Sequence, residues 1–256
     1  MGKNIFITGG TGKIGGQLVA HFVTEGWQVV TTTRKAENLE KLVERGLLNG
    51  EEVKKISLIE VDFLHKEAIQ KVLTFFESKK ELYPHIIVNN ARSLSTLGVE
   101  ENGTSSRKKL LDEYLIDVVV PYELAMGLGY AKGSKLEKII NISSIYGLVP
   151  FNPNLYTNYP HSSPIQYSLA KAATLQLSKE LAIRLADKSI QVNTVSYGGV
   201  KGRVDEAFLE RYAKLCPEGV MLEEEQVIGP VAFLASDASK GITGQNIIQD
   251  GGWTTW

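Results

Sequence analysis

The chain has 256 residues, 43% of them hydrophobic, and a formal net charge of -1. It carries no excess of basic residues and no block of one charge, so we expect no nucleic-acid partner. No apolar run reaches the ~20 residues that a membrane-spanning helix needs, and the N-terminus lacks the pattern of a signal peptide. We therefore expect no membrane partner.

The cysteine and histidine content excludes two further classes of protein. Cys216 is the single cysteine, which excludes an internal disulfide framework and fits a reducing cytosol, so a cytoplasmic location is expected. The four histidines are scattered without the spacing of metal ligands. We expect no metal site.

A glycine-rich turn dominates the first part of the chain. Residues 3–8 are typical of a buried strand, and helical periodicity continues to residue 26. Strand, turn and helix are the context of a dinucleotide-binding fingerprint, and residues 10–15 match G-x-G-x-x-G. We expect the turn to hold a pyrophosphate at the start of the helix. The expected contacts are Gly9, Gly10, Thr11, Gly12, Lys13, Ile14 and Gly15.

Two other interpretations of this turn are a P-loop and a tight turn that binds no ligand. A P-loop needs Ser or Thr where Ile14 stands and a leading glycine where Ile7 stands, so the pattern excludes it. A tight turn with no ligand remains as the alternative to a cofactor site.

The end of the second predicted strand, residues 27–33, bears on the choice of cofactor. A NAD-binding unit places Asp or Glu there to bind the ribose hydroxyls, but this chain has Thr33 followed by Arg34. A guanidinium can bind a 2′-phosphate bidentately, and Lys13 adds a second positive charge. NADP is therefore favoured, and NAD stays open: Arg34 could instead face solvent or stack on adenine, and Glu37 could reach the ribose.

Strands and helices alternate along the rest of the chain without a linker. The further strands are predicted at 55–61, 86–88, 138–142, 190–195 and 246–249. The helices are predicted at 36–45, 66–79, 107–130, across Tyr167 and Lys171, at 204–215 and at 223–236. This order predicts an α/β fold, a single-domain Rossmann fold over residues 1–256. Its doubly wound parallel sheet of about seven strands has helices on both faces and binds ligands at the carboxyl ends of the strands.

Three polar residues are candidates for the ligand site at this edge of the sheet. Asp62 ends a strand and could accept a hydrogen bond from the adenine amino group, or it could cap the helix after it. Tyr167 and Lys171 stand four residues apart, which places them on one helix face. A free tyrosine has a pKa near 10, and a neighbouring ammonium lowers the pKa of such a hydroxyl. The pair can move a proton to or from a substrate oxygen, although a solvated helix face would give the same spacing.

The motifs together resemble the short-chain dehydrogenase/reductase family over essentially the whole chain. They comprise the glycine turn, Asn89-Asn90-Ala91, Asn141-Ile142-Ser143-Ser144, Tyr167-x-x-x-Lys171, and the ending with Leu234-Ala235-Ser236-Asp237, Ile242-Thr243-Gly244-Gln245 and Asp250-Gly251-Gly252. The resemblance implies that Ser144 holds the substrate oxygen and that Tyr167 transfers the proton. Lys171 would bind the nicotinamide ribose and make the tyrosine a better acid. Asn89, Asn90 and Ala91 would line the adenosine side, and Gly198 and Val200 would also contact the cofactor.

The sequence departs from the family pattern at four positions. Lys13 replaces the middle glycine of the usual turn, which gives a spacing similar to that of the larger sugar-nucleotide epimerases and dehydratases, although 256 residues leave no room for their second domain. Arg92 stands where glycine is usual and puts a charge at the cofactor cleft. Asp117 falls on the active-site Asn that supports a water relay to the lysine. Tyr197 replaces a proline beside the nicotinamide.

The segment between Ser144 and Tyr167 is longer than is usual in the family. Its insertion, residues 150–161, is rich in Pro, Asn and aromatic residues and could form a polar-aromatic wall for a hydroxylated substrate. A structural or subunit-contact loop is the alternative, and His161 could contact a substrate hydroxyl or simply face solvent. The insertion resembles reductases of bacterial flagellin-glycan and surface-polysaccharide modification, which favours a sugar or sugar-nucleotide substrate.

The sequence thus predicts an NAD(P)-dependent oxidoreductase of the alcohol dehydrogenase or carbonyl reductase type. It would transfer a hydride between nicotinamide and a carbonyl or secondary alcohol of a small molecule. The alternatives are a catalytically weak NAD(P)-binding regulatory protein, and a sugar epimerase or dehydratase with tightly bound NAD. The family implies a homotetramer or homodimer packed through long helices and the C-terminal strand, and the apolar ending at residues 253–256 suits burial against a partner.

Overall fold

The computed structural model describes residues 3–202 and 204–256, so residues 1, 2 and 203 of the predicted domain lie outside the described part. Its centre is a seven-stranded sheet in the order β3-β2-β1-β4-β5-β6-β7. Every neighbouring pair is parallel. The strands are β1 Asn4–Ile7, β2 Gln28–Thr33, β3 Ser57–Glu60, β4 Ile86–Asn89, β5 Lys138–Ser144, β6 Gln191–Tyr197 and β7 Asn246–Gln249. The predicted doubly wound parallel sheet is confirmed.

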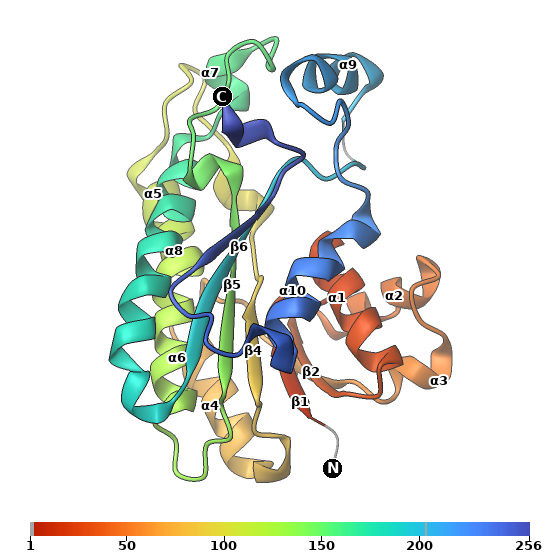
Figure 1. The fold of residues 1–256 in the computed structure, drawn as a ribbon, viewed down its shortest axis with the longest axis vertical. Coiled ribbons are helices and arrows are strands. Elements are labelled where there is room, and N and C mark those ends of the chain that lie inside the picture. The colour runs from red at the N-terminus through yellow and green to blue at the C-terminus, as the bar shows by residue number, and fades with distance from the viewer. Residues whose placement is uncertain (1–2, 203) are drawn as a thin grey trace.

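Helices cover both faces of this sheet (Figure 1). On one face lie α1, α2, α3 and α10, and on the other lie α4, α5, α6 and α8, while α7 and α9 stand beyond the carboxyl ends of the strands. The helices are α1 Lys13–Thr24, α2 Lys41–Glu44, α3 Gly50–Val53, α4 Ala68–Ser78, α5 Arg107–Tyr114, α6 Val120–Gly129, α7 Tyr159–Ser162, α8 Ile165–Arg184, α9 Glu206–Leu215 and α10 Ile228–Ala235.

The strand sequences explain why the sheet has two packed faces. Successive side chains of a strand point to opposite faces. In β1, Ile5 and Ile7 belong to the core on the side of α1 and α10, whereas Phe6 belongs to the core on the side of α4, α6 and α8. All three side chains are fully buried. A continuous apolar strand is therefore what a parallel sheet covered by helices on both sides requires.

The strand order reverses between β1 and β4, and this reversal fixes the place of the cleft. β1 pairs with β2 on one side and with β4 on the other, so the connections after β1 and β4 run to opposite faces of the sheet. A crevice forms outside the carboxyl ends of strands at such a point. Every turn that the sequence analysis associated with a cofactor or substrate follows one of these ends.

Two of the predicted strands run further than their apolar pattern. β5 and β6 continue past Ile142 and Val195, with Ser143 paired to Ser196 and Ser144 to Tyr197. These polar residues belong to the sheet because strand pairing is made by backbone hydrogen bonds, which do not depend on whether a side chain is apolar. Ser144 is thereby fixed at the edge of the cleft.

The helix predicted over residues 36–45 is broken into shorter pieces. A 3₁₀ turn over Ala36–Leu39 precedes α2, and α3 follows after a further turn. The Ala36 N–H donates to the Glu60 carboxylate at 2.7 Å, which ties the start of this segment to the end of β3. Gly46, with φ +68°, ends α2 and separates it from α3.

The helix predicted over residues 107–130 is present but contains a π-helical segment, Leu115–Val119, between α5 and α6. Pro121 has no N–H to donate to the carbonyl of Asp117, so the regular hydrogen bond there cannot form. The Thr174 hydroxyl donates to that carbonyl instead, at 3.0 Å. The irregular turn places Asp117 against α8, and π-helical turns are often found at functional sites.

Candidate active site

A cleft of about 980 Å³ opens at the carboxyl ends of the strands, from the glycine turn to α8 and the loop after β6. Most of the residues proposed from the sequence line it. They are Gly9, Thr11, Gly12, Lys13, Ile14, Gly15, Thr33, Arg34, Asp62, Asn90, Ala91, Ser144, Tyr167, Lys171, Gly198 and Val200. Gly10 and Asp117 are absent from its wall, because Gly10 packs under the turn and Asp117 lies behind Lys171.

The glycine turn is shaped by close packing and leaves room at the start of α1. Gly9 has φ +69°, and a Cβ at Gly15 would overlap the Gly9 carbonyl. A Cβ at Gly10 would overlap Thr31. α1 begins after Gly12 with no side-chain cap and no acidic residue in its first turn. Its N-terminal amides and positive dipole end face the cleft, which fits the pyrophosphate of a dinucleotide.

The segment after β4 holds the glycine turn in place. The Thr8 hydroxyl accepts hydrogen bonds from the N–H groups of Asn90 and Ala91, both at 2.9 Å. The Asn90 amide donates to the carbonyls of Thr8 and Gly9 at 2.9 and 3.2 Å. Asn89 instead donates to the Asn141 side chain at 2.7 Å, inside the protein and away from the cleft wall.

The far end of the cleft, beyond β2, is polar and cationic. Arg34 lines it and is exposed, and Lys41 donates to Asn38 at 2.6 Å. Glu37 lies off the wall, where it pairs with Lys35 at 3.6 Å. The residues that follow β2 thus bring positive charge to this end of the cleft and no carboxylate. Such a surface fits a ribose that carries a phosphate group.

Asp62 and Lys13, in the cofactor half of the cleft near the glycine turn, form hydrogen bonds within the protein. The Asp62 carboxylate accepts from the Leu64 N–H at 3.0 Å, and α4 starts after Glu67, so Asp62 does not cap that helix. Lys13 donates to the Val200 carbonyl at 2.7 Å, which joins the glycine turn to the loop after β6. A positive group thus stays beside the turn in a fixed position.

The reaction end of the cleft is built by β5 and α8. Ser144, at the end of β5, accepts from the Tyr146 N–H at 3.2 Å. Ser143 donates to the Lys171 carbonyl at 2.9 Å and ties α8 to β5. Gly147 faces the Lys171 backbone, which a Cβ would approach to 2.8 Å. This contact lets α8 lie close to the end of β5, and Ser144, Tyr167 and Lys171 all line the cleft.

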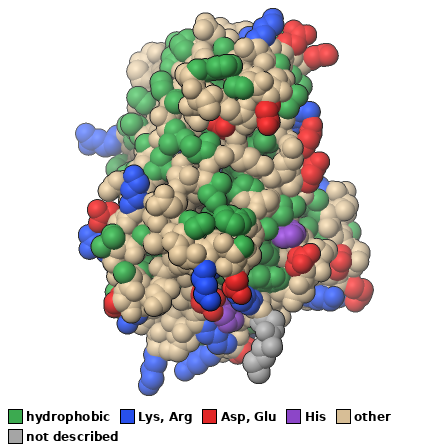
Figure 2. Space-filling view, in the orientation of Figure 1, with side chains coloured by type: hydrophobic (Ala, Val, Ile, Leu, Met, Phe, Trp, Pro, Cys, Tyr) green, Lys and Arg blue, Asp and Glu red, His purple; other side chains and the backbone are tan. Residues whose placement is uncertain are grey.

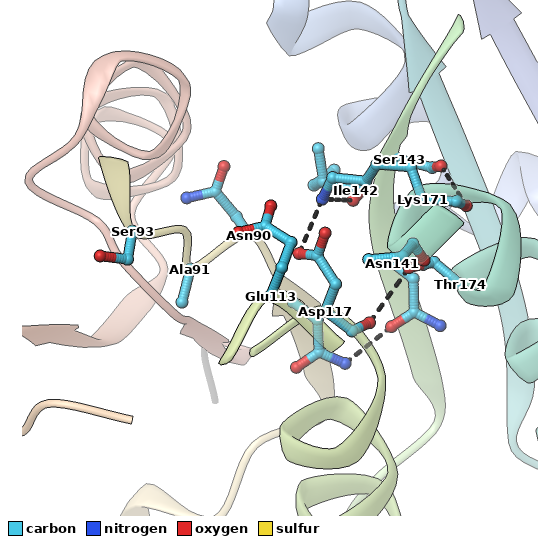
Figure 3. Close-up of polar contacts among 12 residues, drawn as sticks. Asn90, Ala91, Ser93, Glu113, Asp117, Asn141, Ile142, Ser143, Lys171 and Thr174 are labelled. Atoms are coloured by element: carbon cyan, nitrogen blue, oxygen red, sulfur yellow. Dashed lines mark hydrogen bonds and ion pairs between the residues drawn. The ribbon is translucent and has the colours of Figure 1, made fainter. Parts of the chain in front are cut away.

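Lys171 is held by three groups within the protein. Its ammonium donates to Asp117 Oδ1 at 2.9 Å and to the Ile142 carbonyl at 3.0 Å, as Figure 3 shows. It also lies 5.7 Å from the centroid of the Tyr167 ring. Burial lowers the pKa of Lys171, but Asp117 and Tyr167 raise it by more, so its pKa lies above the usual value. The lysine stays cationic.

A second buried acid, Glu113, stands one helical turn before Asp117 (Figure 3). Its side chain accepts from the Thr96 hydroxyl, and the Gln166 amide donates to the Thr96 carbonyl at 2.8 Å. Burial raises the pKa of Glu113, and the negative charge of Asp117 raises it further. Burial likewise raises the pKa of Asp117, which Lys171 counteracts in part. Glu113 and Asp117 are four residues apart, so the sequence alone could have placed them on one helix face, but neither the motifs nor the family resemblance pointed to Glu113.

A small cavity of about 10 Å³ lies behind Lys171, lined in part by Asn89, Asp117, Asn141 and Thr174. Asp117 Oδ2 and Asn89 Oδ1 are buried without a hydrogen-bond partner. The volume is close to that of one water molecule.

The insertion at residues 150–161 folds over the reaction end. The Phe151 ring stacks on Tyr146 with centroids 3.8 Å apart and lies 6.5 Å from the Tyr167 ring. The hydroxyls of Tyr146 and Tyr156 are 2.6 Å apart. Burial raises the pKa of Tyr156 to about 12 and that of Tyr146 further, so both stay neutral. The loop supplies an aromatic wall.

Two further side chains, His161 and Trp253, have partners within the chain. His161 is exposed and lines the cleft, so both alternatives given for it stay open. Its ring nitrogens also contact the Asn158 side chain at 2.9 Å and the Glu101 carbonyl at 2.8 Å, which anchors the loop. Trp253 was expected to be buried against a partner subunit, but it stacks on Tyr212 of its own chain, with centroids 4.6 Å apart. Trp256 does remain exposed.

Arg92 lines the cleft, as expected of a charge at this position. Its guanidinium carbon lies 4.9 Å from the centroid of the Tyr167 ring, so it stands beside the reaction end. The sequence could not show this, because Arg92 follows β4 and Tyr167 belongs to α8.

Comparisons with known proteins agree with this geometry. The profile of the family described as enoyl-(acyl carrier protein) reductase matches residues 11–254. An NADP-dependent (R)-specific alcohol dehydrogenase from Lentilactobacillus kefiri is 32% identical, with 99% of this chain and 97% of that protein aligned. The post-translational flagellin modification protein A of Campylobacter coli is 38% identical over 124 residues, which is 48% of each chain.

Solved structures show the same architecture. A short chain dehydrogenase from Leptospira borgpetersenii with bound NAD+ superposes with a TM-score of 0.84 at 25% identity, over 99% of this chain and 93% of that one. ElxO with NADP bound gives a TM-score of 0.81 at 25% identity, over 100% of both chains.

The chain belongs to the short-chain dehydrogenase/reductase family. It is accordingly an NAD(P)-dependent oxidoreductase that acts on small molecules. In the described part of the chain, no helix has both the length and the apolar character needed to cross a membrane.

Proposed function

We propose that this protein transfers a hydride between NADP and a carbonyl or secondary alcohol carbon of a sugar or sugar nucleotide. The observation that carries the proposal is the convergence of Ser144, Tyr167 and Lys171 on one end of a dinucleotide-sized cleft. Residues 1–256 would form a single NAD(P)-binding domain, with the substrate site made by the insertion at residues 150–161. Nicotinamide, when bound, supplies or accepts the hydride.

The three side chains divide the remaining work. In the reduction direction, Ser144 donates a hydrogen bond to the substrate oxygen and orients it. Tyr167 gives its hydroxyl proton to that oxygen as the carbon becomes an alcohol, and in oxidation it takes the proton back. Lys171 holds a positive charge beside Tyr167, which stabilises the phenolate left after proton transfer.

Proton return to Tyr167 would use the groups behind Lys171. The family's relay position holds Asp117, whose Oδ1 already contacts the Lys171 ammonium at 2.9 Å. A water in the small cavity lined by Asp117 and Asn89 would extend this chain of hydrogen bonds. We propose that Asp117 supports the relay with its carboxylate as well as its backbone.

The preference for NADP rests on Arg34. It lines the adenosine end of the cleft and has no carboxylate beside it from its own segment, since Glu37 is paired with Lys35. A relative with 32% identity carries the name of an NADP-dependent enzyme. Structural neighbours at 25% identity include one with NAD+ and one with NADP, so NAD is the alternative.

The proposed substrate class rests on the insertion loop and on one relative. Phe151, Leu155 and Tyr156 line the cleft beside Tyr167, and aromatic faces of this kind suit the apolar face of a sugar ring or a base. The similarity to a flagellin modification protein covers about half of the chain. It supports a role in the modification of flagellin.

A catalytically weak, cofactor-binding regulatory protein is the second candidate. The observation in its favour is that Lys171 is engaged by both Asp117 and the Ile142 carbonyl. A lysine held in this way has fewer donors left for the nicotinamide ribose. The presence of Tyr167 favours an active oxidoreductase over this regulatory protein.

We also propose that the protein is a homodimer or homotetramer in the cytoplasm. α5 packs beside α8, and their exposed apolar side chains include Leu111, Tyr114, Ile165, Leu169 and Ile183. Around β7 and α10, Ile248 and Phe233 are exposed, and Figure 2 shows hydrophobic side chains gathered in the middle of this face. Cys216 is a buried free thiol, which suits a reducing compartment.

The Tyr167→Phe variant tests the proposed activity. It removes the only proton that Tyr167 can transfer, so kcat should fall by about 10²–10⁴-fold while NADPH still binds. Turnover is measured by NADPH absorbance on a panel of carbonyl compounds and sugars, and binding by NADPH fluorescence. Tyr122→Phe, at an exposed position of α6, is the control and should behave as wild type. Wild-type binding of NADPH without turnover of any panel member would favour the regulatory protein.

A further inference from the structure

Two arginines that line the cleft lack a charged partner among residues 3–202 and 204–256. Arg34 is at the adenosine end, and Arg92 is at the reaction end. Neither makes an ion pair or a hydrogen bond with any described residue, and both are exposed. In contrast, Arg45 of the same wall pairs with Glu224 at 2.7 Å. The proposed cofactor accounts for Arg34 but leaves Arg92 without a ligand.

The position of Arg92 suits a substrate group. It directly follows the Ala91 segment at the end of β4, and its guanidinium lies over the Tyr167 ring at 4.9 Å. Contact with an aromatic face limits the freedom of the guanidinium without using its N–H donors. Those donors remain available to a molecule whose reacting carbon lies at Tyr167.

Two buried acids, Glu113 and Asp117, lie near enough for the charge of Arg92 to oppose the rise in their pKa values, but neither forms an ion pair with it. Asp117 is committed to Lys171 at 2.9 Å, and Glu113 is buried behind the cleft with its carboxylate bonded to Thr96. Burial raises the pKa of Glu113, which favours its neutral form. Among described residues, the acids on the cleft wall are Asp62 and Glu224, both at the cofactor half. Arg92 therefore presents its positive charge on the cleft wall without an ion pair to any described acid.

The wall around Arg92 strengthens its attraction for an anion. Tyr146, Phe151, Leu155 and Tyr156 form an aromatic and apolar surface on the same end of the cleft. A substrate seated between Arg92 and this surface would displace water, and charge interactions are stronger where water is excluded. A planar guanidinium binds carboxylate and phosphate oxygens with two parallel hydrogen bonds.

We propose that Arg92 binds a carboxylate or phosphate group of the substrate, so that the enzyme selects anionic carbonyl or hydroxyl compounds over neutral ones. This inference rests on the proposed oxidoreductase function and names its substrate class. Among sugars, it favours an acidic sugar, a sugar phosphate or a nucleotide sugar over a neutral sugar.

Matched probes test the inference. 4-Formylbenzoate, 4-formylphenyl phosphate and methyl 4-formylbenzoate share one aldehyde on one ring and differ in charge. The wild type should show a higher kcat/KM for at least one anionic probe than for the ester. In Arg92→Gln, the ratio of anion to ester should fall about tenfold or more, because a charge-assisted hydrogen bond is lost. Arg92→Lys should retain part of the ratio, and the two anions separate carboxylate from phosphate recognition.

The control variant is Arg184→Gln, at the exposed end of α8, where Arg184 pairs with Glu180. It should keep the wild-type ratio. Thermal unfolding of every variant checks that the fold is retained. An unchanged ratio in Arg92→Gln overturns the inference. A weaker affinity for NADPH in Arg92→Gln, with the ratio unchanged, would assign Arg92 to the cofactor and also overturn it.

The inference can fail separately from the proposed activity. If the wild type turns over no probe, calorimetric titration of 4-formylbenzoate and its ester into the protein replaces the rate measurement. The acid should then bind more tightly than the ester to the wild type, and this difference should shrink in Arg92→Gln. Equal affinities of the wild type for acid and ester would overturn the inference, whatever the outcome of the turnover assays.

Discussion

The Lys171 ammonium and the Asp117 carboxylate form an ion pair at 2.9 Å, with side-chain exposures of 7% and 3%. The pair joins α8 to the irregular turn between α5 and α6, where Thr174 also contacts the Asp117 backbone. Two charges removed from water are stable only when each is well paired. The pair thus fixes both the position of Lys171 and the packing of two helices behind Tyr167.

Removing one partner of this pair should destabilise the protein strongly. Asp117→Ala leaves the Lys171 ammonium buried with one carbonyl partner, and a broken buried pair typically costs about 3–5 kcal/mol. Asp117→Asn keeps an oxygen that can accept from Lys171, so its cost should be smaller. The free energy of unfolding is measured by urea titration.

The matched control for this prediction is Glu180→Ala, which breaks the exposed pair between Glu180 and Arg184. An exposed pair contributes about 0–1 kcal/mol, so its loss should be small. If Asp117→Ala and Glu180→Ala proved equally mild, the buried pair would not stabilise the packing of α8.

Glu113 should make the stability of the protein depend on pH. Its pKa is raised in the folded state from the ordinary 4.5, first by burial and then by Asp117. The folded protein therefore keeps this proton to higher pH than the unfolded chain does. The stability from this group is fully present below about pH 4.5 and is lost as the pH rises through the folded-state pKa.

Glu113→Gln removes this titration and keeps an oxygen that can accept from Thr96. The variant should gain stability relative to wild type as the pH rises, by at most about 1.4 kcal/mol per pH unit within the window. Urea unfolding of both proteins at several pH values measures this. A constant difference between them across the pH range would contradict the prediction, and Glu180→Gln serves as the exposed control.

Arg34 should discriminate between the two cofactors. Arg34→Ala removes the guanidinium that we assign to the 2′-phosphate, so the Kd for NADPH should rise about 10–100-fold while that for NADH changes little. Fluorescence titration with each cofactor measures both constants. Equal weakening of NADPH and NADH would show that Arg34 is no phosphate ligand. Lys35→Ala, a neighbouring exposed position paired with Glu37, is the control.

The Phe151 ring should support both the loop and the reaction end. Phe151→Ala removes the stacking on Tyr146 and the contact with Tyr167, and truncation of a buried Phe costs about 3–5 kcal/mol when the site cannot collapse. Water admitted to the reaction end should also lower kcat/KM. Tyr156→Phe, which removes one hydroxyl and keeps the ring, should cost only about 1 kcal/mol. Equal effects of the two variants would show that the ring itself contributes little.

The helix over residues 107–130 illustrates the limit of reading structure from sequence. Its periodicity predicts one helix, and α5 and α6 are both present. The π-helical turn between them depends on Pro121 and on a hydroxyl from Thr174 of another helix. Pro121 can be read from the sequence. The contact from Thr174 depends on how α8 packs against this segment, which the sequence does not show.

The sequence by itself determined the order of strands and helices, the parallel sheet, the glycine turn and the spacing of Tyr167 and Lys171. These follow from local periodicity, from glycine positions and from spacings within one element, all of which neighbouring residues encode. The candidate Ser144 came from the resemblance to the family. Only the tertiary structure placed Arg92 over Tyr167, buried Glu113 beside Asp117, anchored His161 to residue 101 and packed Trp253 inside its own chain. The physical reason is that each of these contacts joins segments far apart in the chain, where burial and charge are set by the partner and not by the residue.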